Sequence, residues 1–349
     1  MSAKPKRSPS GAQKSVALAL QGGGAHGAFA WGVLDRLLED GRLAVEGVSA
    51  TSAGAMNAAV LAYGLLEGGP ERARLALHDF WRDIASVAEM SSPFRLLPWE
   101  KLMHKGFGLD HSPMYLMTDM MLRVLSPYQF NPLNLNPLRD VLDRHVDFGA
   151  LNKHCPIQLY LCATNVETGK VRVFSREDIC IKAVLASACL PFLFQAVEID
   201  GEHFWDGGYV GNPAIFPLIY NCGTRDVVIV HINPIERKGV PTTAAEILNR
   251  INEVSFNSSL IRELRAIAFV TTLIQDGKID RADMKEMLIH SICSDKTMGE
   301  LGVSSKLNAD WGFLCFLRDK GRAEADAWLG RHYESIGQRS SMDIHKEFL

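Results

Sequence analysis

The sequence predicts an α/β protein: a three-layer α/β/α sandwich with a mainly parallel central sheet, followed by an α-helical C-terminal extension. Two observations carry this prediction. Short apolar runs of strand length alternate with segments whose apolar residues recur at helical spacing. Each of the first two runs also ends in a tight turn of small residues, after which a helix begins at once. Strands separated by helices form parallel, helix-covered sheets, which bind ligands at the carboxyl ends of their strands.

The first strand, turn and helix form one unit. The run 16–20 is apolar throughout, three glycines follow it, and Leu34, Leu37 and Leu38 then recur at helical spacing. Such a turn leaves backbone N–H groups unpaired at the positive end of a helix dipole, so that an anion is stabilised there. Glycine allows a ligand to approach the backbone closely. The turn therefore suits either the pyrophosphate of a nucleotide or the oxyanion of a breaking ester.

The second strand separates these two alternatives. The glycines that satisfy the dinucleotide-binding pattern G-x-G-x-x-G are Gly22, Gly24 and Gly27. A dinucleotide site also needs an acidic residue about 20 residues further on, but the second strand, 45–51, ends without one. Ala50, Ser52 and Gly54 instead match a nucleophile elbow, G-x-S-x-G, in which a sharp strand-to-helix turn exposes the serine hydroxyl. The sequence therefore favours a site for the oxyanion of a breaking ester over a site for a nucleotide.

Later elements continue the alternation of strands and helices. In order, we expect a hairpin over 157–164 and 171–174, a helix over 178–188, a hairpin turning at Asp200 and Gly201, and a strand over 226–234. Asp206 then follows a strand directly, so that Ser52 and Asp206 both lie at carboxyl ends of strands. From Thr243 onward we expect only helices, beginning at the capping box that Thr243 forms with Glu246. Asp280 and Asp310 are expected to cap two further helices.

Three ordered motifs resemble those of the patatin-like phospholipases. They are GGGAHG, ATSAG and the Asp-Gly-Gly of FWDGGYVGNP, and they occur in that family's order and structural context over residues 15–221. The helices after residue 240 resemble an extension of unassigned function in a group of bacterial patatin-like proteins. The resemblance implies the three-layer fold and a lipid acyl hydrolase, a carboxylic ester hydrolase of phospholipase A type.

The resemblance also implies the roles of particular residues. In that family a serine and an aspartate form a catalytic dyad, which corresponds here to Ser52 as nucleophile and Asp206 as its partner. The glycine-rich loop is the oxyanion hole, and its residues here are Gly22, Gly23, Gly24, Ala25 and Gly27. The small residues that support the motifs are Ala50, Gly54, Gly207 and Gly208. His26 stands where the family usually has arginine or lysine.

The implied chemistry proceeds through an acyl-enzyme and needs neither a metal nor a cofactor. Asp206 would take the proton of Ser52 directly, and because an ordinary aspartate is a weak base, burial would have to raise its pKa or the oxyanion hole would have to carry more of the barrier. The expected substrates are phospholipids or related lipids. A carboxylesterase, thioesterase or polyester depolymerase with the same dyad is the alternative among enzymes, and a non-catalytic lipid- or partner-binding scaffold is the alternative outside them. His231, near the end of a later strand, leaves open a Ser-Asp-His triad.

Composition sets outer limits on the function. The chain of 349 residues is 47% hydrophobic and has a net charge of -3, which gives no reason to expect a nucleic-acid partner. Its seven scattered cysteines include no CxxC pair and favour a reducing, cytoplasmic compartment. No apolar stretch reaches the about eighteen residues of a spanning helix, so contact with the inner membrane surface would be peripheral. The oligomeric state stays open.

We expect three parts in the chain: a disordered basic tail at 1–14, a catalytic domain at 15–240 and the helical extension at 241–349. Within the catalytic domain, six of the twelve methionines lie between Met90 and Met121. This Met-rich helical insertion, at about 86–147, has two interpretations. Methionine conforms to irregular apolar shapes, which suits a lid or an acyl-chain groove, but methionine stripes at helical spacing are usually packed core.

Overall fold

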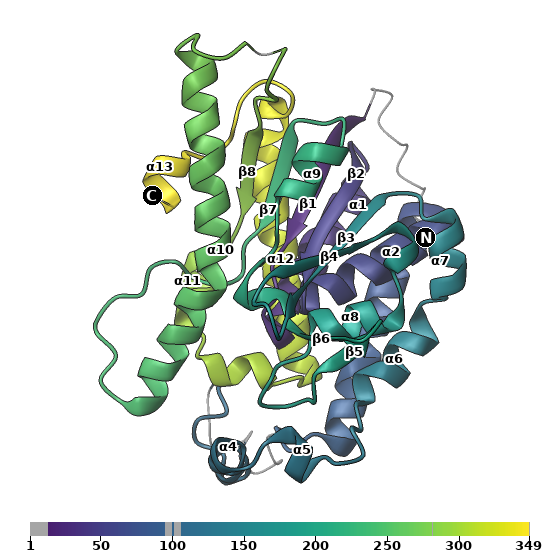
Figure 1. Ribbon diagram of the computed structural model, residues 1–349, viewed down its shortest axis with the longest axis vertical. Coiled ribbons are helices and arrows are strands. Elements are labelled where there is room, and N and C mark those ends of the chain that lie inside the picture. The colour runs from purple at the N-terminus through teal and green to yellow at the C-terminus, as the bar shows by residue number, and fades with distance from the viewer. Residues whose placement is uncertain (1–12, 95–99, 101–105, 281, 349) are drawn as a thin grey trace, which may run out of the picture.

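An eight-stranded sheet forms the centre of the molecule, whose computed structural model describes residues 13–94, 100, 106–280 and 282–348 (Figure 1). The strand order is β5-β6-β3-β2-β1-β7-β8, and β4 pairs with β3 outside this path. The strands are β1 (Lys14–Leu20), β2 (Leu43–Thr51), β3 (Gln158–Asn165), β4 (Val171–Ser175), β5 (Val197–Ile199), β6 (Glu202–Asp206), β7 (Asp226–Val230) and β8 (Leu288–Ile292). All pairings among β1, β2, β3, β7 and β8 are parallel, which confirms the predicted mainly parallel sheet.

Helices cover both faces of this sheet and complete the predicted three layers (Figure 1). One core packs α1 (Gly27–Asp40), α2 (Ala53–Ser91), α8 (Ile181–Ser187) and α12 (Trp311–His332) against one face, and the other packs α9 (Phe216–Asn221), α10 (Ala244–Gln275) and α13 (Ile344–Phe348) against the opposite face. Alternate residues of β1 serve the two cores: Leu18 and Leu20 belong to the first, and Ala17 and Ala19 to the second. The sheet is thus buried on both sides.

The residues after 240 are not purely helical, which corrects the expectation from the sequence. β8 pairs in parallel with β7 and extends the sheet. Asp280, expected to cap a helix, precedes only a turn, in which it accepts a hydrogen bond from the N–H of Ala282. Asp310 does cap α12, and the capping box of Thr243 and Glu246 does begin α10. The C-terminal helices are present as expected, but β8 and α12 belong to the same layered body as the sheet.

Two predicted segments lie partly outside the described residues. The basic tail was expected to reach residue 14, but Lys14 already belongs to β1, and the tail's first twelve positions are not described. The Met-rich insertion forms the end of α2, α4 (Pro113–Val124), α5 (Pro127–Phe130) and α6 (Pro137–His145), and α7 (Phe148–His154) follows it; 95–99 and 101–105 are not described. Every residue of α4 is described, and its one buried residue is Thr118, whereas its methionines are 39% to 69% exposed. The interpretation as packed core is therefore wrong for α4.

Two glycines allow α12 to pack closely on α1. A Cβ atom at Gly32 would collide with the backbone carbonyl of Arg318, and one at Gly321 would collide with the carbonyl of Phe29. Because these obstacles are backbone atoms, no change of rotamer relieves them. The first layer of helices therefore depends on residues from both ends of the chain.

We expect Gly321→Ala to lower the free energy of unfolding by about 1–3 kcal/mol, because the added methyl group forces α12 away from α1. Gly330→Ala on the same helix is the matched control, since Gly330 is exposed and a Cβ atom there meets nothing within 4 Å. The higher helix propensity of alanine should leave that control unchanged or more stable by up to about 1 kcal/mol. Urea denaturation measures both, and equal effects of the two substitutions would contradict the packing argument.

Candidate active site

Ser52 occupies the sharp turn between β2 and α2. Its φ of 56° and ψ of -124° lie in a region that residues with side chains rarely adopt, and it is 7% exposed. Its N–H donates to the Oγ of Ser187 at 2.9 Å, and its carbonyl accepts the N–H of Met56 in the first turn of α2. The strand, turn and helix predicted for this stretch are therefore present, with Ser52 at the helix N-terminus.

Small residues around this turn are required by close contacts. A Cβ atom at Gly22 would lie 2.6 Å from the Cβ of Ser52, and one at Gly54 would lie 2.8 Å from the carbonyl oxygen of Gln21. Ala50 is wholly buried in β2. The glycine-rich loop after β1 therefore lies directly against the serine turn.

The glycine-rich loop presents a run of unpaired backbone donors. The loop residues whose N–H groups donate no hydrogen bond to any described residue are Gly23, Gly24 and Ala25. Gly24 has a φ of 58°, a left-handed conformation that favours glycine. The N–H of Gly22 donates to the Oδ1 of Asn212 at 2.7 Å, and the N–H of Gly27 bonds to carbonyls within the loop. The N–H groups of Gly22 and Gly27 are thus already hydrogen-bonded. Of the five residues assigned to the oxyanion hole, Gly23, Gly24 and Ala25 remain as donors without a described partner.

Asp206 lies at the end of β6, beside the serine turn. In the sheet, Thr51 pairs with Cys162 of β3, and the next residue of β3, Ala163, pairs with Asp206 on the other side. Asp206 and Ser52 therefore reach the site from opposite sides of β3. β2 ends directly before Ser52 and β6 ends at Asp206, so the expectation that both residues lie at carboxyl ends of strands is confirmed, although β6 runs antiparallel to β3. The register of the strands, rather than a shared direction, brings the two residues together.

The carboxyl group of Asp206 is completely buried. Burial raises its pKa from 3.8 to about 6, against the lowering effects of the Gly208 N–H, of the Ser52 side chain and of the Lys306 charge. Gly208 donates to Oδ1 at 2.7 Å, whereas Oδ2 is buried and receives no hydrogen bond of normal geometry from a described residue. One carboxylate oxygen is thus fixed, and the other is available to accept a proton.

Two further glycines of the Asp-Gly-Gly motif are packed tightly around this carboxyl group. A Cβ atom at Gly207 would collide with the backbone carbonyl of Cys162, and one at Gly208 would lie 2.9 Å from the ring of Phe256. Gly207 therefore excludes a side chain, and a side chain at Gly208 would have to displace the Phe256 ring. These contacts explain why two glycines follow the aspartate. They are consistent with the supporting role expected for Gly207 and Gly208.

His231 does not join the site. It follows β7 directly, its ring lies 5.6 Å from the ring of Phe348, and burial lowers its pKa. β1 separates β7 from β2, and two strand spacings amount to about 10 Å. No contact of the His231 side chain with Ser52 or Asp206 is present in the described part of the chain. The geometry therefore gives no support to a Ser-Asp-His triad.

Buried amide side chains support the glycine-rich loop through hydrogen bonds. These residues were not predicted from the sequence. The Oε1 of Gln21 accepts the N–H groups of Ile232 and Asn233 at 2.9 and 3.1 Å, and its amide nitrogen donates to Asn257 at 3.3 Å. The Nδ2 of Asn233 donates to the carbonyl of Gly22 at 2.8 Å. These partners lie as many as 236 positions apart in the chain, so no local pattern could identify them.

A C-terminal segment, 299–308, lies against the glycine-rich loop, and we call it the strap. The carbonyl of Lys306 sits where a side chain at Gly24 would otherwise be. The Nε2 of His26 lies 2.7 Å from the Oγ of Ser305, which itself donates to the carbonyl of Gly302. His26 therefore donates through Nε2, and burial holds its pKa well below the usual value, so that the imidazole is neutral. No motif in the sequence of this segment indicates that it belongs to the site.

No metal site is evident among the described residues, since no three His, Cys, Asp or Glu side chains gather there in a group that could hold an ion. Among the described helices, none combines the length and the apolar composition that a bilayer-spanning segment needs.

A strained serine turn, a buried carboxyl group beside it and a loop of unpaired N–H groups thus meet at one end of an α/β sheet. A family model described as patatin-like phospholipase matches residues 18–219, which is more than half of the chain. The chain therefore belongs to the patatin-like phospholipase family. No curated protein matches the chain.

Several solved structures are similar to the chain at low sequence identity. VipD from Legionella pneumophila is 15% identical with a TM-score of 0.38, and the match covers 92% of this chain and 67% of VipD. The ExoU-SpcU complex from the type III secretion system of Pseudomonas aeruginosa is 16% identical with a TM-score of 0.41, covering 93% of this chain and 52% of that one. A type III effector ExoU structure is 17% identical with a TM-score of 0.33, covering 91% and 53%. This chain thus spans about half the length of the ExoU chains.

Asp206→Asn should stabilise the protein at high pH. The folded-state pKa of about 6 lies above the ordinary 3.8, so the folded protein binds this proton more tightly than the unfolded chain, and stability falls as the pH rises through that window. The neutral amide avoids this loss, which above the window amounts to at most about 3 kcal/mol.

Denaturation of both proteins between about pH 4 and pH 8 measures this difference, which should disappear at the acid end. The exposed Asp200→Asn, in the turn before β6, is the matched control and should show no comparable trend. A stability gain for Asp206→Asn that does not change with pH would mean that the carboxyl group does not titrate in this window.

Proposed function

We propose that this protein is a serine acyl hydrolase that cleaves the acyl ester bonds of glycerophospholipids or related lipids, with Ser52 as nucleophile and Asp206 as general base. The state of Asp206 is the observation that carries the proposal. Its pKa of about 6 keeps it ionised at neutral pH while making it a far better proton acceptor than an exposed aspartate. Its Oδ2 has no competing hydrogen bond of normal geometry from a described residue.

In the proposed mechanism, the Oγ of Ser52 attacks the carbonyl carbon of the ester and its proton passes to the Oδ2 of Asp206. The carbonyl oxygen becomes an oxyanion, which preorganised N–H groups stabilise at the moment the charge develops. The available donors are those of Gly23, Gly24 and Ala25. The alcohol leaves with the proton from Asp206, and water then cleaves the acyl-enzyme by the same route. No step requires a cofactor.

The dyad can be tested by substitution and by covalent labelling. Ser52→Ala and Asp206→Asn should each lower kcat at least about 10³-fold, and the double variant should cost little more, because both groups act on one proton. A fluorophosphonate probe should label the wild type at Ser52 and leave Ser52→Ala unlabelled. Ser91→Ala, at the exposed far end of the same helix, is the matched control.

Two outcomes would change the proposal. Turnover or labelling of Ser52→Ala at the wild-type level would exclude Ser52 as the nucleophile. A folded wild type that neither reacts with the probe nor hydrolyses any ester would favour a non-catalytic lipid- or partner-binding scaffold.

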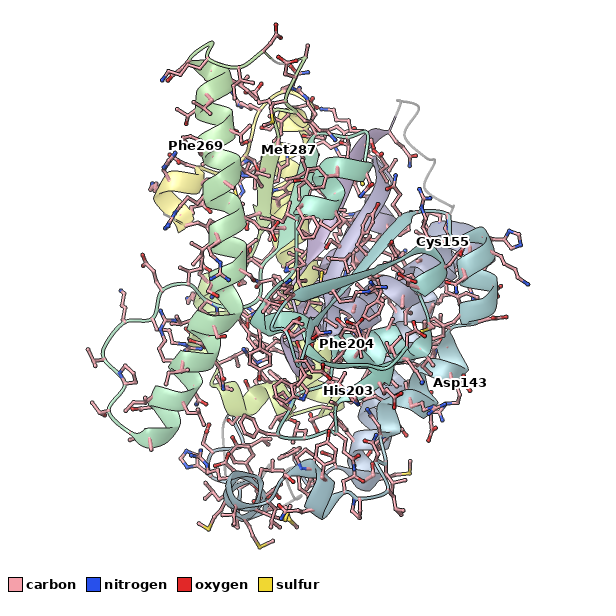
Figure 2. The ribbon with its side chains drawn as sticks, in the orientation of Figure 1. Asp143, Cys155, His203, Phe204, Phe269 and Met287 are labelled. Carbon is pink, nitrogen blue, oxygen red and sulfur yellow. The ribbon has the colours of Figure 1, made fainter. Side chains whose placement is uncertain are left out.

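An exposed apolar surface on α4, α5 and the residues after α5 supports a lipid substrate. These two helices lie together at one end of the molecule (Figure 1). The members of this surface, which we call the apolar rim, are Met114, Leu116, Met117, Met120, Met121, Val124, Tyr128, Leu133 and Leu135. Sulfur atoms point outward along the outer edge of α4 (Figure 2). Extended apolar patches on soluble domains mark interaction sites, and flexible methionines suit an acyl-chain environment.

The apolar rim is joined to the loop that leads toward Asp206. Gln195 donates to the carbonyl of Asn131 at 2.8 Å, and the hydroxyl of Tyr128 accepts the N–H of Ala196 at 3.3 Å. Residues 195 and 196 directly precede the β5–β6 hairpin, which ends in Asp206. We therefore propose that the rim makes the peripheral contact with the inner membrane surface and delivers lipid to the site.

Replacing Met117 and Met120 by lysine should suppress hydrolysis of phospholipid vesicles at least about tenfold, since each exposed methionine would otherwise bury apolar area in the membrane. These two side chains are 66% and 69% exposed, so their loss should leave the fold and the hydrolysis of a soluble butyrate ester unchanged. Leu75→Lys, at an apolar position on α2 that is 57% exposed, is the control.

Equal losses on vesicles and on the soluble ester would show that the rim does not act through the membrane. A wild type that prefers soluble thioesters or short polyesters to any phospholipid would replace the lipid assignment by an esterase, thioesterase or depolymerase with the same dyad.

A further inference from the structure

The strap is anchored firmly, although it lies outside the residues that the family model matches. Arg237 donates to the carbonyls of Gly299 and Leu301 at 2.9 and 2.8 Å, and it forms an ion pair with the buried Glu253 of α10 at 2.6 Å. Further along, Asn308 donates to the carbonyl of Phe107 at 2.8 Å. The strap is therefore held at both ends, with Lys306 between these anchors.

Lys306 engages the glycine-rich loop at two points. Its backbone carbonyl packs against Gly24, so closely that no side chain fits there. Its ammonium group donates to the Oδ1 of Asn233 at 2.7 Å, and the Nδ2 of the same amide donates to the carbonyl of Gly22 at 2.8 Å. Asn233 is completely buried and therefore transmits the position of Lys306 to the loop.

The charged and titratable groups that interact with this ammonium group are Glu253, Arg237, Asp206 and His26. Glu253 raises and Arg237 lowers the pKa of Lys306, and Asp206 raises it, but burial has the largest effect and lowers the pKa to about 8. The charge of Arg237 is already paired with Glu253, and His26 is neutral. Lys306 in turn lowers the pKa of both Asp206 and His26.

We propose that Lys306 is a positioning residue of the active site: through Asn233 it fixes the glycine-rich loop, and it supplies the positive charge that the neutral His26 does not. A hydrogen bond from an ammonium group is stronger than one from a neutral amine, so the protonated lysine holds the loop more firmly. Oxyanion donors act only if they are preorganised, so this support should appear in kcat. The proposal rests on the Ser52–Asp206 mechanism proposed above.

The first test compares three lysine variants on a soluble butyrate ester. Lys306→Met should lower kcat at neutral pH about tenfold to a hundredfold with little change in KM, because a displaced oxyanion hole affects the transition state rather than binding. Lys306→Arg keeps the charge and should recover most of the loss. Lys296→Met, at an exposed lysine of α11 (Asp295–Glu300), should match the wild type. Asn233→Leu should reproduce the loss, and its double variant with Lys306→Met should not exceed it.

The pH profile separates positioning by a charge from a purely structural role. Wild-type kcat should decline severalfold between neutral pH and about pH 9.5, because Lys306 loses its proton as the pH rises through about 8. Lys306→Met, without a titrating group, should lack this decline, and Lys306→Arg should lack it while remaining active, since arginine stays protonated. A decline that persists unchanged in both variants would overturn the proposal.

A stability measurement tests the same charge without relying on catalysis. Removing the positive charge should raise the folded-state pKa of Asp206, so the stabilisation by Asp206→Asn should level off at a higher pH, and at a larger value, in the Lys306→Met background than in the wild type. An unchanged plateau would mean that Lys306 does not act on Asp206 and would overturn the inference. If this plateau changes but the wild type shows no turnover that depends on Ser52, then the proposed function fails while the electrostatic link from Lys306 to Asp206 stands.

Discussion

The burial of one carboxyl group, that of Asp206, is the constraint on which the rest of the site depends. A carboxylate without water needs fixed partners, and here the Gly208 N–H and the charge of Lys306 supply part of what is lost. The remaining destabilisation keeps the pKa high and must be offset by the two apolar cores that flank the sheet. The burial that makes Asp206 a stronger base therefore also lowers the stability of the folded protein.

The glycine-rich loop shows how the site is distributed over the chain. Its own residues provide unpaired donors, but Asn212, Asn233 and Lys306 hold their neighbours in place. A loop of glycines has little rigidity of its own. Its geometry must therefore come from the buried amides of Asn212 and Asn233 and from the strap. All of these lie later in the chain than the loop and the serine turn.

The sequence predicted the parts of the fold that depend on local patterns. The β1 and β2 turns, the β3–β4 and β5–β6 hairpins, α8 and the cap of α10 follow from apolar spacing and from turn and capping residues. It could not predict that β6 runs antiparallel to β3, nor that β8 joins the sheet, because strand pairing is set by distant partners. Lys306 was missed for the same reason: an isolated lysine in a polar stretch carries no signal until the fold brings it to Asn233. The methionines of α4 left two interpretations open, because the same spacing suits a buried stripe and an exposed one, and only the structure shows that they are exposed.

The pairing of β8 with β7 determines how the chain can be divided. In a fragment ending near residue 240, β7 would become the edge of the sheet, and the backbone N–H and C=O groups that now bond to β8 would be unpaired along a strand that is buried throughout. Unpaired edges of this kind recruit other chains and cause aggregation. The same fragment would uncover the face of α1 on which α12 packs. The catalytic domain predicted at 15–240 is therefore not a transferable module, and an exchange of this domain must carry the C-terminal strand and helices with it.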